Sequence, residues 1–122
     1  MTVHVLIVDD SPSHVYALRY MLERHGYQVS VASNGKEGVQ VAQELHPDVI
    51  LMDVVMPQLN GFQATRQLHK NQDTASIPVL MFSSKDKSTD RLWAMRQGAK
   101  QYLTKPTTEI ELLGAIKSCL SE

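Results

Sequence analysis

The chain has 122 residues, of which 43% are hydrophobic and 20% charged, and its formal net charge at pH 7 is -1. This length fits one globular domain, so we expect residues 1–122 to form a single domain. The near-neutral charge argues against nucleic acid as a partner and against a polybasic membrane anchor. No apolar run approaches the ~20 residues that span a bilayer, and the N-terminus lacks the features of a signal peptide. With Cys119 as the single cysteine, we expect a cytoplasmic protein without membrane insertion.

Short apolar runs recur along the chain and alternate with helical patterns. The first and third runs are nearly continuous in Val, Ile and Leu, which is typical of strands covered by helices on both faces. The runs are Val3–Val8, Tyr27–Ala32, Val49–Met52, Pro78–Phe82 and Gln101–Thr104.

Residues that begin or end helices separate these runs. Ser11 is a candidate N-cap, and Pro12 suits the first helical position. The five predicted helices lie between Ser11-Pro12 and Gly26, from Asn34-Gly35 to before Pro47, after Asn60-Gly61, between Asp86 and Gly98, and after Pro106 with Thr107 or Thr108 as the cap.

Five strand–helix units in succession predict an α/β fold with right-handed crossovers and a parallel sheet. We expect a flavodoxin-like doubly wound (βα)5 domain with five parallel strands in the order 2-1-3-4-5. The first helix should cover one face of the sheet and the next helices the other. Ligands of such sheets bind at the carboxyl ends of the strands, beside the point between the first and third strands where the order reverses.

Three aspartates are predicted to meet at that point. Asp9 and Asp10 end the first strand, and Asp53 follows the third. A single aspartate at a strand end is more often a helix cap or a turn residue. Three carboxylates together repel each other, at up to about 4 kcal/mol for each pair ~4 Å apart at an effective dielectric constant of 20. The cluster therefore indicates a cation, and its hard oxygen ligands favour Mg²⁺.

A carboxylate beside Mg²⁺ can act as a nucleophile toward phosphorus without a general base, because it is already ionised at neutral pH. Phosphoryl transfer then needs further positive charge and hydrogen bonds on the phosphoryl oxygens. Lys105 follows the fifth strand and Ser83 ends the fourth, so both lie at the predicted edge. Taken singly, Lys105 could be a solvated surface lysine and Ser83 a helix cap.

In this order and spacing, these segments resemble a receiver domain of the response regulators of two-component signalling, over essentially the full chain. The matching segments are Leu6–Ser11, Leu51–Pro57, Asn60-Gly61, Pro78–Ser83 and Gly98–Pro106. In finer detail, the segments Asn60–Leu68, Arg96–Ala99 and Tyr102–Pro106 are similar to PilH-type receivers of type IV pilus chemosensory systems, and CheY-type receivers are the broader match.

The resemblance implies a role for each acidic residue. Asp53 would accept the phosphoryl group. Asp10 would ligate Mg²⁺ directly, Asp9 would act mainly through water, and the backbone carbonyl of Val55 would complete the protein ligands. Lys105 would pair with a phosphoryl oxygen.

The resemblance also implies a switch. Ser83 would hydrogen-bond another phosphoryl oxygen, and Tyr102 would move inward as Ser83 moves toward it. A cis peptide bond is implied at Lys105-Pro106. In this family the positions occupied by Val55 and Lys85 help to set the dephosphorylation rate, so the lifetime of the phosphoryl group stays open.

We therefore expect a phosphorylation-controlled switch that is not a classical enzyme, apart from slow self-dephosphorylation. A sensor histidine kinase or its phosphotransfer domain would donate the phosphoryl group. The fourth helix, fifth strand and fifth helix would bind a downstream protein, in the control of twitching, pilus or chemotaxis-type motility. The chain should be a monomer that can dimerise when phosphorylated. The candidate residues of the partner face are Arg91, Trp93, Lys100 and Tyr102.

Four alternative functions share parts of this pattern. Without a recognisable effector domain, the chain could drain phosphoryl groups from a shared kinase instead of binding a target. A Mg²⁺-dependent phosphatase of the haloacid-dehalogenase type would need a second aspartate where Val55 stands. A flavin-binding flavodoxin-like module is disfavoured because Asp9-Asp10 would repel the flavin phosphate. The intact set of acidic, hydroxyl and lysine residues argues against an inactive scaffold.

Overall fold

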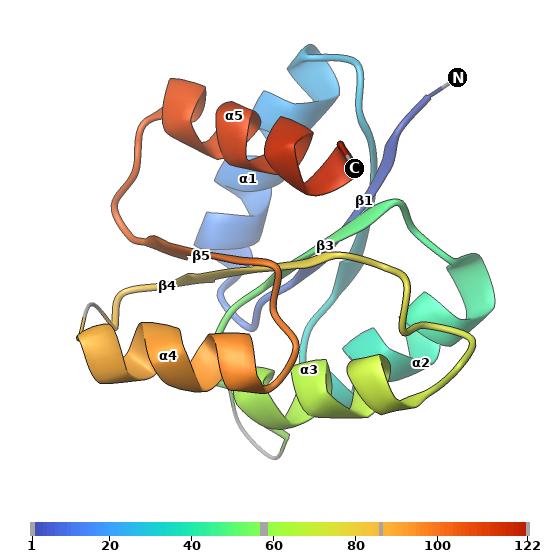
Figure 1. The fold of residues 1–122 in the computed structure, drawn as a ribbon. Helices are drawn as coiled ribbons and strands as arrows, with labels where there is room; N and C mark the ends of the chain where they lie inside the picture. The colour runs from blue at the N-terminus through green and yellow to red at the C-terminus, as the bar shows by residue number, and fades with distance from the viewer. Residues whose placement is uncertain (1, 57–58, 86, 122) are drawn as a thin grey trace.

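The computed structural model describes residues 2–56, 59–85 and 87–121. Strands and helices alternate along the chain, as the sequence predicted (Figure 1). The strands are β1 His4–Val8, β2 Gln28–Ala32, β3 Val49–Met52, β4 Val79–Ser83 and β5 Gln101–Thr104. The helices are α1 Pro12–Arg24, α2 Gly35–Leu45, α3 Gly61–Lys70, α4 Ser88–Arg96 and α5 Glu109–Leu120.

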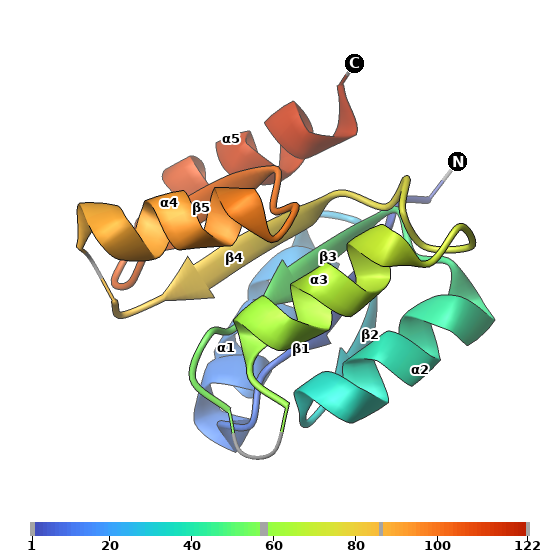
Figure 2. The ribbon, with the colours of Figure 1, turned by 60° about the horizontal axis from the view of Figure 1, so that its bottom comes forward.

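The strands form one parallel sheet in the order β2-β1-β3-β4-β5, which confirms the predicted topology. Helices α1 and α5 lie on one face of the sheet, and α2, α3 and α4 lie on the other (Figures 1 and 2). The sheet is therefore covered on both sides, which explains why β1 and β3 consist almost entirely of apolar residues.

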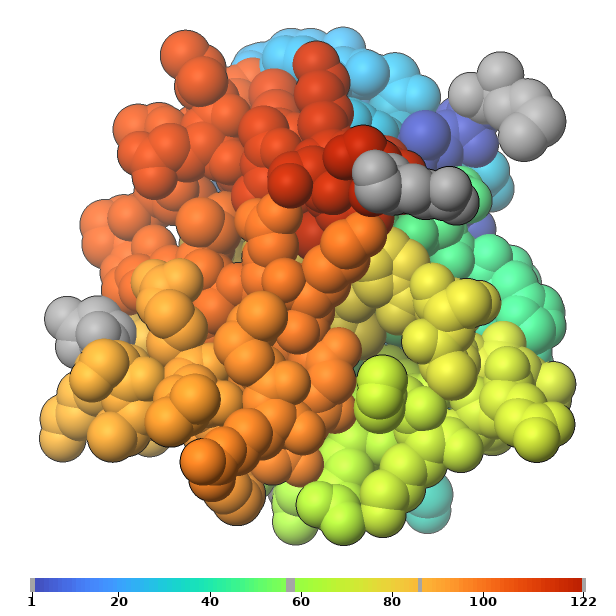
Figure 3. Space-filling view, in the orientation of Figure 1, coloured from blue at the N-terminus to red at the C-terminus, as the bar shows by residue number. Residues whose placement is uncertain are grey.

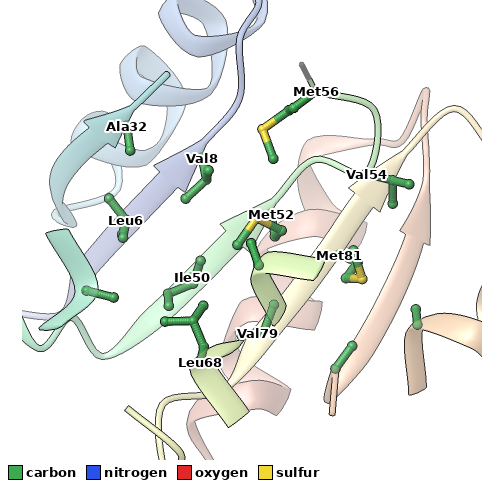
Figure 4. Packing of buried hydrophobic residues seen from close by; sticks show 14 of the residues in the cluster. Leu6, Val8, Ala32, Ile50, Met52, Val54, Met56, Leu68, Val79 and Met81 are labelled. Carbon is green, nitrogen blue, oxygen red and sulfur yellow. The ribbon is translucent and has the colours of Figure 1, made fainter. Parts of the chain in front are cut away.

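Successive residues of the central strands point to opposite faces and build two cores. In β1, Leu6 and Val8 pack with the α2–α4 layer, where Ala64 and Leu68 of α3 meet the sheet (Figure 4). The other core lies under α1 and α5, and it includes Ile7 of β1. Both cores end at the same edge of the sheet, where polar residues lie at the ends of β1, β3 and β4.

The predicted caps are present at most helix starts. The side chain of Ser11 caps α1, Asn34 caps α2, and Asn60 forms a reciprocal capping box with Gln63. Of the two candidates for α5, Thr108 is the cap: its hydroxyl accepts a hydrogen bond from the Glu111 N–H. Asp86, the predicted lower limit of the fourth helix, lies outside the described residues, and α4 begins at Ser88.

Helix α4 packs on the protein through very little of its surface. Ala94 is its single fully buried residue, and Leu92, Trp93 and Met95 are all exposed. From the helical spacing of their apolar side chains, Leu92 and Met95 are predicted to lie on a buried face of this helix, and their exposure shows that this prediction is wrong. Because Ala94 is small, it lets the helix backbone approach the sheet while the larger neighbouring side chains remain in solvent.

Within the three described segments, none of the helices combines the length and hydrophobicity that crossing a bilayer requires.

Candidate functional site

The register of β1 and β3 brings the acidic residues together. Val8 pairs with Met52 as the last pair of these neighbouring parallel strands. The next residue on each strand is an aspartate, and the Asp53 N–H donates to the Val8 carbonyl oxygen at 2.9 Å. One carboxylate oxygen from each of Asp9, Asp10 and Asp53 lies within 4.8 Å of the other two. The structure thus places the three predicted acidic residues in one cluster.

The three carboxylates differ in exposure. Asp9 is buried, Asp10 is exposed, and the Asp53 side chain is 12% exposed. Burial raises the pKa of Asp53, because a charged carboxylate loses hydration there; the Lys105 ammonium lowers it, and repulsion from Asp9 raises it. The net direction is upward, so this site destabilises the ionised form of Asp53.

Lys105 reaches the cluster from the end of β5. Its backbone N–H donates to the Ser83 carbonyl at 2.7 Å, which fixes the start of the following loop. Its Nζ lies 3.2 Å from Asp9 Oδ2, 3.8 Å from Asp53 Oδ1 and 5.1 Å from the centre of the Phe82 ring. The peptide bond Lys105-Pro106 is cis, as the family resemblance implied.

Ser83 and Tyr102 are linked through one backbone segment. The Ser83 hydroxyl is buried and accepts a hydrogen bond from the Lys85 N–H at 3.2 Å. The Tyr102 hydroxyl donates to the Lys85 carbonyl at 2.6 Å, and its residue is only 4% exposed. Tyr102 is therefore turned inward in this structure, and burial raises the pKa of its phenol.

The four residues predicted for a partner face do not all lie open to solvent. Trp93 is 50% exposed. Tyr102 lies beneath Arg91, whose guanidinium stands 5.4 Å from the ring centre and donates to the Tyr102 carbonyl at 3.0 Å. The Lys100 ammonium donates to carbonyls at the end of α5, those of Cys119 and Ser121. Arg91, Trp93 and Lys100 are therefore the exposed residues of this face, whereas Tyr102 is buried. The surface of α4 is the orange region in Figure 3.

Val55 follows the cluster, and its side chain is 57% exposed. Pro57, part of the motif that carried the resemblance, lies outside the described residues.

Two residues near the cluster were not recognised as site residues in the sequence. Gly61 was predicted to start a helix and belongs to the segment Asn60-Gly61 that carries the resemblance, but it was given no role in the site; a Cβ there would stand 2.1 Å from the Asp53 carbonyl oxygen. Glycine therefore lets α3 begin directly against the backbone of Asp53, at the end of β3. The Nδ1 of His14 lies 3.3 Å from Lys105 Nζ. Its position at the start of α1 was the one available signal, because that helix begins at the same sheet edge.

The arrangement is a doubly wound α/β sheet with a carboxylate cluster and a lysine at its carboxyl edge. Residues 5–117 match the family model described as the response regulator receiver domain. The chain therefore belongs to the response regulator receiver family.

Individual relatives agree with this assignment. The chain is 56% identical over 117 residues to the protein PilH of Pseudomonas aeruginosa, covering 96% of this chain and 97% of PilH. It spans about half the length of other curated relatives that it matches, at 38% and 35% identity.

Solved structures show the same fold. The chemotaxis protein CheY4 of Vibrio cholerae has a TM-score of 0.92 and 30% identity, with 98% of this chain and 100% of that chain covered. A receiver domain of a Pseudomonas aeruginosa sensor histidine kinase has a TM-score of 0.92 and 27% identity, and covers 100% of both chains. That crystal structure has a magnesium ion coordinated in its active-site cleft.

Proposed function

We propose that the chain accepts a phosphoryl group on Asp53 in a Mg²⁺-dependent reaction and then changes which protein it binds. The observation that carries this proposal is the position of the Asp53 carboxylate, within 4.8 Å of oxygens of Asp9 and Asp10 and 3.8 Å from the Lys105 ammonium. A carboxylate placed between an oxygen-rich cation site and a fixed ammonium has the surroundings that phosphoryl transfer requires.

The donor set fits Mg²⁺, which prefers carboxylate and carbonyl oxygens. Asp10, Asp53 and the Val55 carbonyl would ligate the ion, with Asp9 acting mainly through water. When bound, Mg²⁺ supplies positive charge that offsets the carboxylates and the phosphoryl oxygens. A magnesium ion in the cleft of the histidine kinase receiver domain supports this assignment.

In the reaction, an Asp53 carboxylate oxygen attacks phosphorus and forms an acyl phosphate. The bond from phosphorus to the donor breaks, and the leaving group is the imidazole of a phosphohistidine, which takes up a proton. Lys105 donates a hydrogen bond to one phosphoryl oxygen, and Ser83 donates one to another. The donor is a sensor histidine kinase or its phosphotransfer domain. Hydrolysis of the acyl phosphate returns the chain slowly to its first state.

The link from the site to the surface runs through Lys85. The Ser83 hydroxyl and the Tyr102 hydroxyl both bond to the backbone of Lys85. A Ser83 hydroxyl that turns toward a phosphoryl oxygen gives up its bond with the Lys85 N–H. The Lys85 backbone and the Tyr102 ring that bonds to it then change position together. This movement extends to Arg91 and Trp93 on α4.

The high identity to PilH over nearly its full length supports a role in pilus-dependent or chemotaxis-type motility. In this proposal residues 1–122 act as one receiver domain, a monomer before phosphorylation, with the α4–β5–α5 face as the binding surface. Draining phosphoryl groups from a shared kinase is the alternative output of the same chemistry.

The test is labelling with radioactive acetyl phosphate, a small phosphodonor. The wild-type chain should be labelled only with Mg²⁺, and the label should have the lability of an acyl phosphate. Asp53→Asn should abolish labelling. Asp73→Asn, which removes the same charge at an exposed position, should label like the wild type. Labelling that persists in Asp53→Asn, or that excess EDTA leaves unchanged, would overturn the proposal.

A further inference from the structure

The surroundings of the Lys105 ammonium contain one partner that the family resemblance does not assign. A lysine ammonium has three N–H donors. Two polar atoms lie within hydrogen-bond distance of it, Asp9 Oδ2 at 3.2 Å and His14 Nδ1 at 3.3 Å. Asp53 Oδ1 is farther away, at 3.8 Å. Two of the three donors therefore have acceptors, and the third is left to donate to an oxygen of a phosphoryl group on Asp53.

We propose that His14 is a positioning residue for phosphoryl transfer, which holds the Lys105 ammonium so that its remaining donor faces Asp53. This inference rests on the proposed function, because it assigns His14 a role only through Lys105. In the contact, His14 Nδ1 accepts from the ammonium, so the ring proton is on Nε2. His14 touches neither the acceptor carboxylate nor the phosphoryl group.

The start of α1 fixes the position of His14. The Ser11 N–H donates to Asp9 Oδ1 at 2.9 Å, which ties the loop to the acidic cluster. The Ser11 hydroxyl accepts from the His14 N–H at 3.5 Å, and Pro12 occupies the first helical position. The backbone of His14 is therefore held relative to Asp9, within reach of a lysine 91 residues away.

The His14 side chain has no evident role in the core, since it is 55% exposed and its polar neighbours are Lys105 and Asp9. A second acceptor is useful because Lys105 is long and has many rotamers to lose when it is ordered. Asp9 alone would draw the ammonium to one side of the cluster. A metal ion that shares Asp9 would weaken this attraction, whereas the Nδ1 acceptor of His14 stays available.

Three replacements of His14 test the contact. His14→Ala removes the acceptor, and acetyl phosphate labelling should slow about fivefold, as expected for the loss of one hydrogen bond of ordinary strength on a half-exposed side chain. His14→Asn places its Oδ1 close to the position of Nδ1 and should restore the rate to within about twofold. In His14→Gln the acceptor lies one bond farther out, so the rate should stay low. All three should melt within about 2 °C of the wild type, because the side chain is exposed.

A second measurement asks whether His14 acts through Lys105. In a Lys105→Met background, which lacks the ammonium, His14→Ala should change the labelling rate by a factor of about one. A second readout without phosphorylation is the NMR signal of the Lys105 ζ-ammonium group in the metal-free protein. His14→Ala should shift this signal and speed its hydrogen exchange, and His14→Asn should reverse both effects.

An equal slowing by His14→Ala in both backgrounds would overturn the inference, and so would an unchanged Lys105 ammonium signal. The two proposals fail in distinguishable ways. If Asp53→Asn abolishes labelling while the His14 variants label normally, the phosphoacceptor proposal stands and the inference on His14 fails. If the wild type is never labelled, the proposed function fails, and the NMR signal still decides whether His14 holds Lys105.

Discussion

Replacing Asp53 by asparagine should stabilise the metal-free protein, although it removes the proposed phosphoacceptor. The change keeps the shape of the side chain and deletes one negative charge from the cluster. Burial raises the pKa of Asp53, so the folded state holds the proton more tightly than the unfolded chain does. For a carboxyl group shifted in this direction, ionisation favours unfolding.

The size of the effect follows from the opposing interactions of this carboxylate. Carboxylate oxygens of Asp9 and Asp53 lie within 4.8 Å of each other, so at an effective dielectric constant of 20 their repulsion is at least about 3.5 kcal/mol. Lys105, at 3.8 Å, attracts it by about 4 kcal/mol on the same scale. These two nearly cancel, and the exposed Asp10 adds little. The cost of burying the charge remains, so we expect Asp53→Asn to raise the free energy of unfolding by about 1–2 kcal/mol.

For a chain of this size, that corresponds to a rise in melting temperature of about 3–8 °C. Thermal unfolding in EDTA at pH 7.5 measures it, with Asp73→Asn as the control for a lost surface charge. The gain should shrink as the pH falls toward 3.8, the ordinary pKa of an aspartate, and vanish below it, where the wild-type side chain is protonated in both states. Mg²⁺ should raise the melting temperature of the wild type more than that of Asp53→Asn. An unchanged or lower melting temperature for Asp53→Asn at pH 7.5 would refute the reasoning.

Two further predictions concern the backbone. Gly61→Ala should destabilise the chain by at least about 2 kcal/mol and slow labelling, because the added Cβ would meet the Asp53 carbonyl oxygen. In Gly114→Ala on α5 the added Cβ meets nothing within 4 Å, so this control should stabilise the chain by up to about 1 kcal/mol in urea unfolding. Equal effects of the two substitutions would contradict this account. His46→Gly should raise the unfolding free energy by about 0.5–1 kcal/mol, since His46 has a φ of 48° at the end of α2. His25→Gly, at a C-cap with a φ of -95°, should show no such gain, and a similar gain there would argue against the backbone explanation.

The fold and the acidic cluster could be predicted because both depend on local sequence patterns. In a parallel sheet, these patterns determine where each strand ends and which residues lie at its edge. The apolar runs define the strands, and each aspartate is the residue at which a run ends. Once β1 and β3 are neighbours, Asp9 and Asp53 must lie side by side, whatever the other side chains do. The same reasoning places Ser83 and Lys105 at that edge, and the register of β4 with β5 agrees with it.

Other features depend on contacts between side chains from distant segments. The sequence favoured a buried face for Leu92 and Met95, but the small Ala94 sets how close α4 comes to the sheet and leaves its neighbours exposed. The inward position of Tyr102 depends on the carbonyl of Lys85. Such contacts depend on the placement of the helices and on side-chain rotamers. The periodicity of apolar residues in the sequence specifies neither.

The sequence by itself thus determined the strand order and the acidic edge, because alternating apolar and helical segments leave few ways to cover a parallel sheet. Only the tertiary structure decided that α3 begins against the Asp53 carbonyl through Gly61, and that His14 meets Lys105. The contact between His14 and Lys105 joins residues that are 91 positions apart in the chain. Both contacts depend on differences of a few ångströms in packing, whereas the strand pattern fixes only which edge of the sheet these residues share.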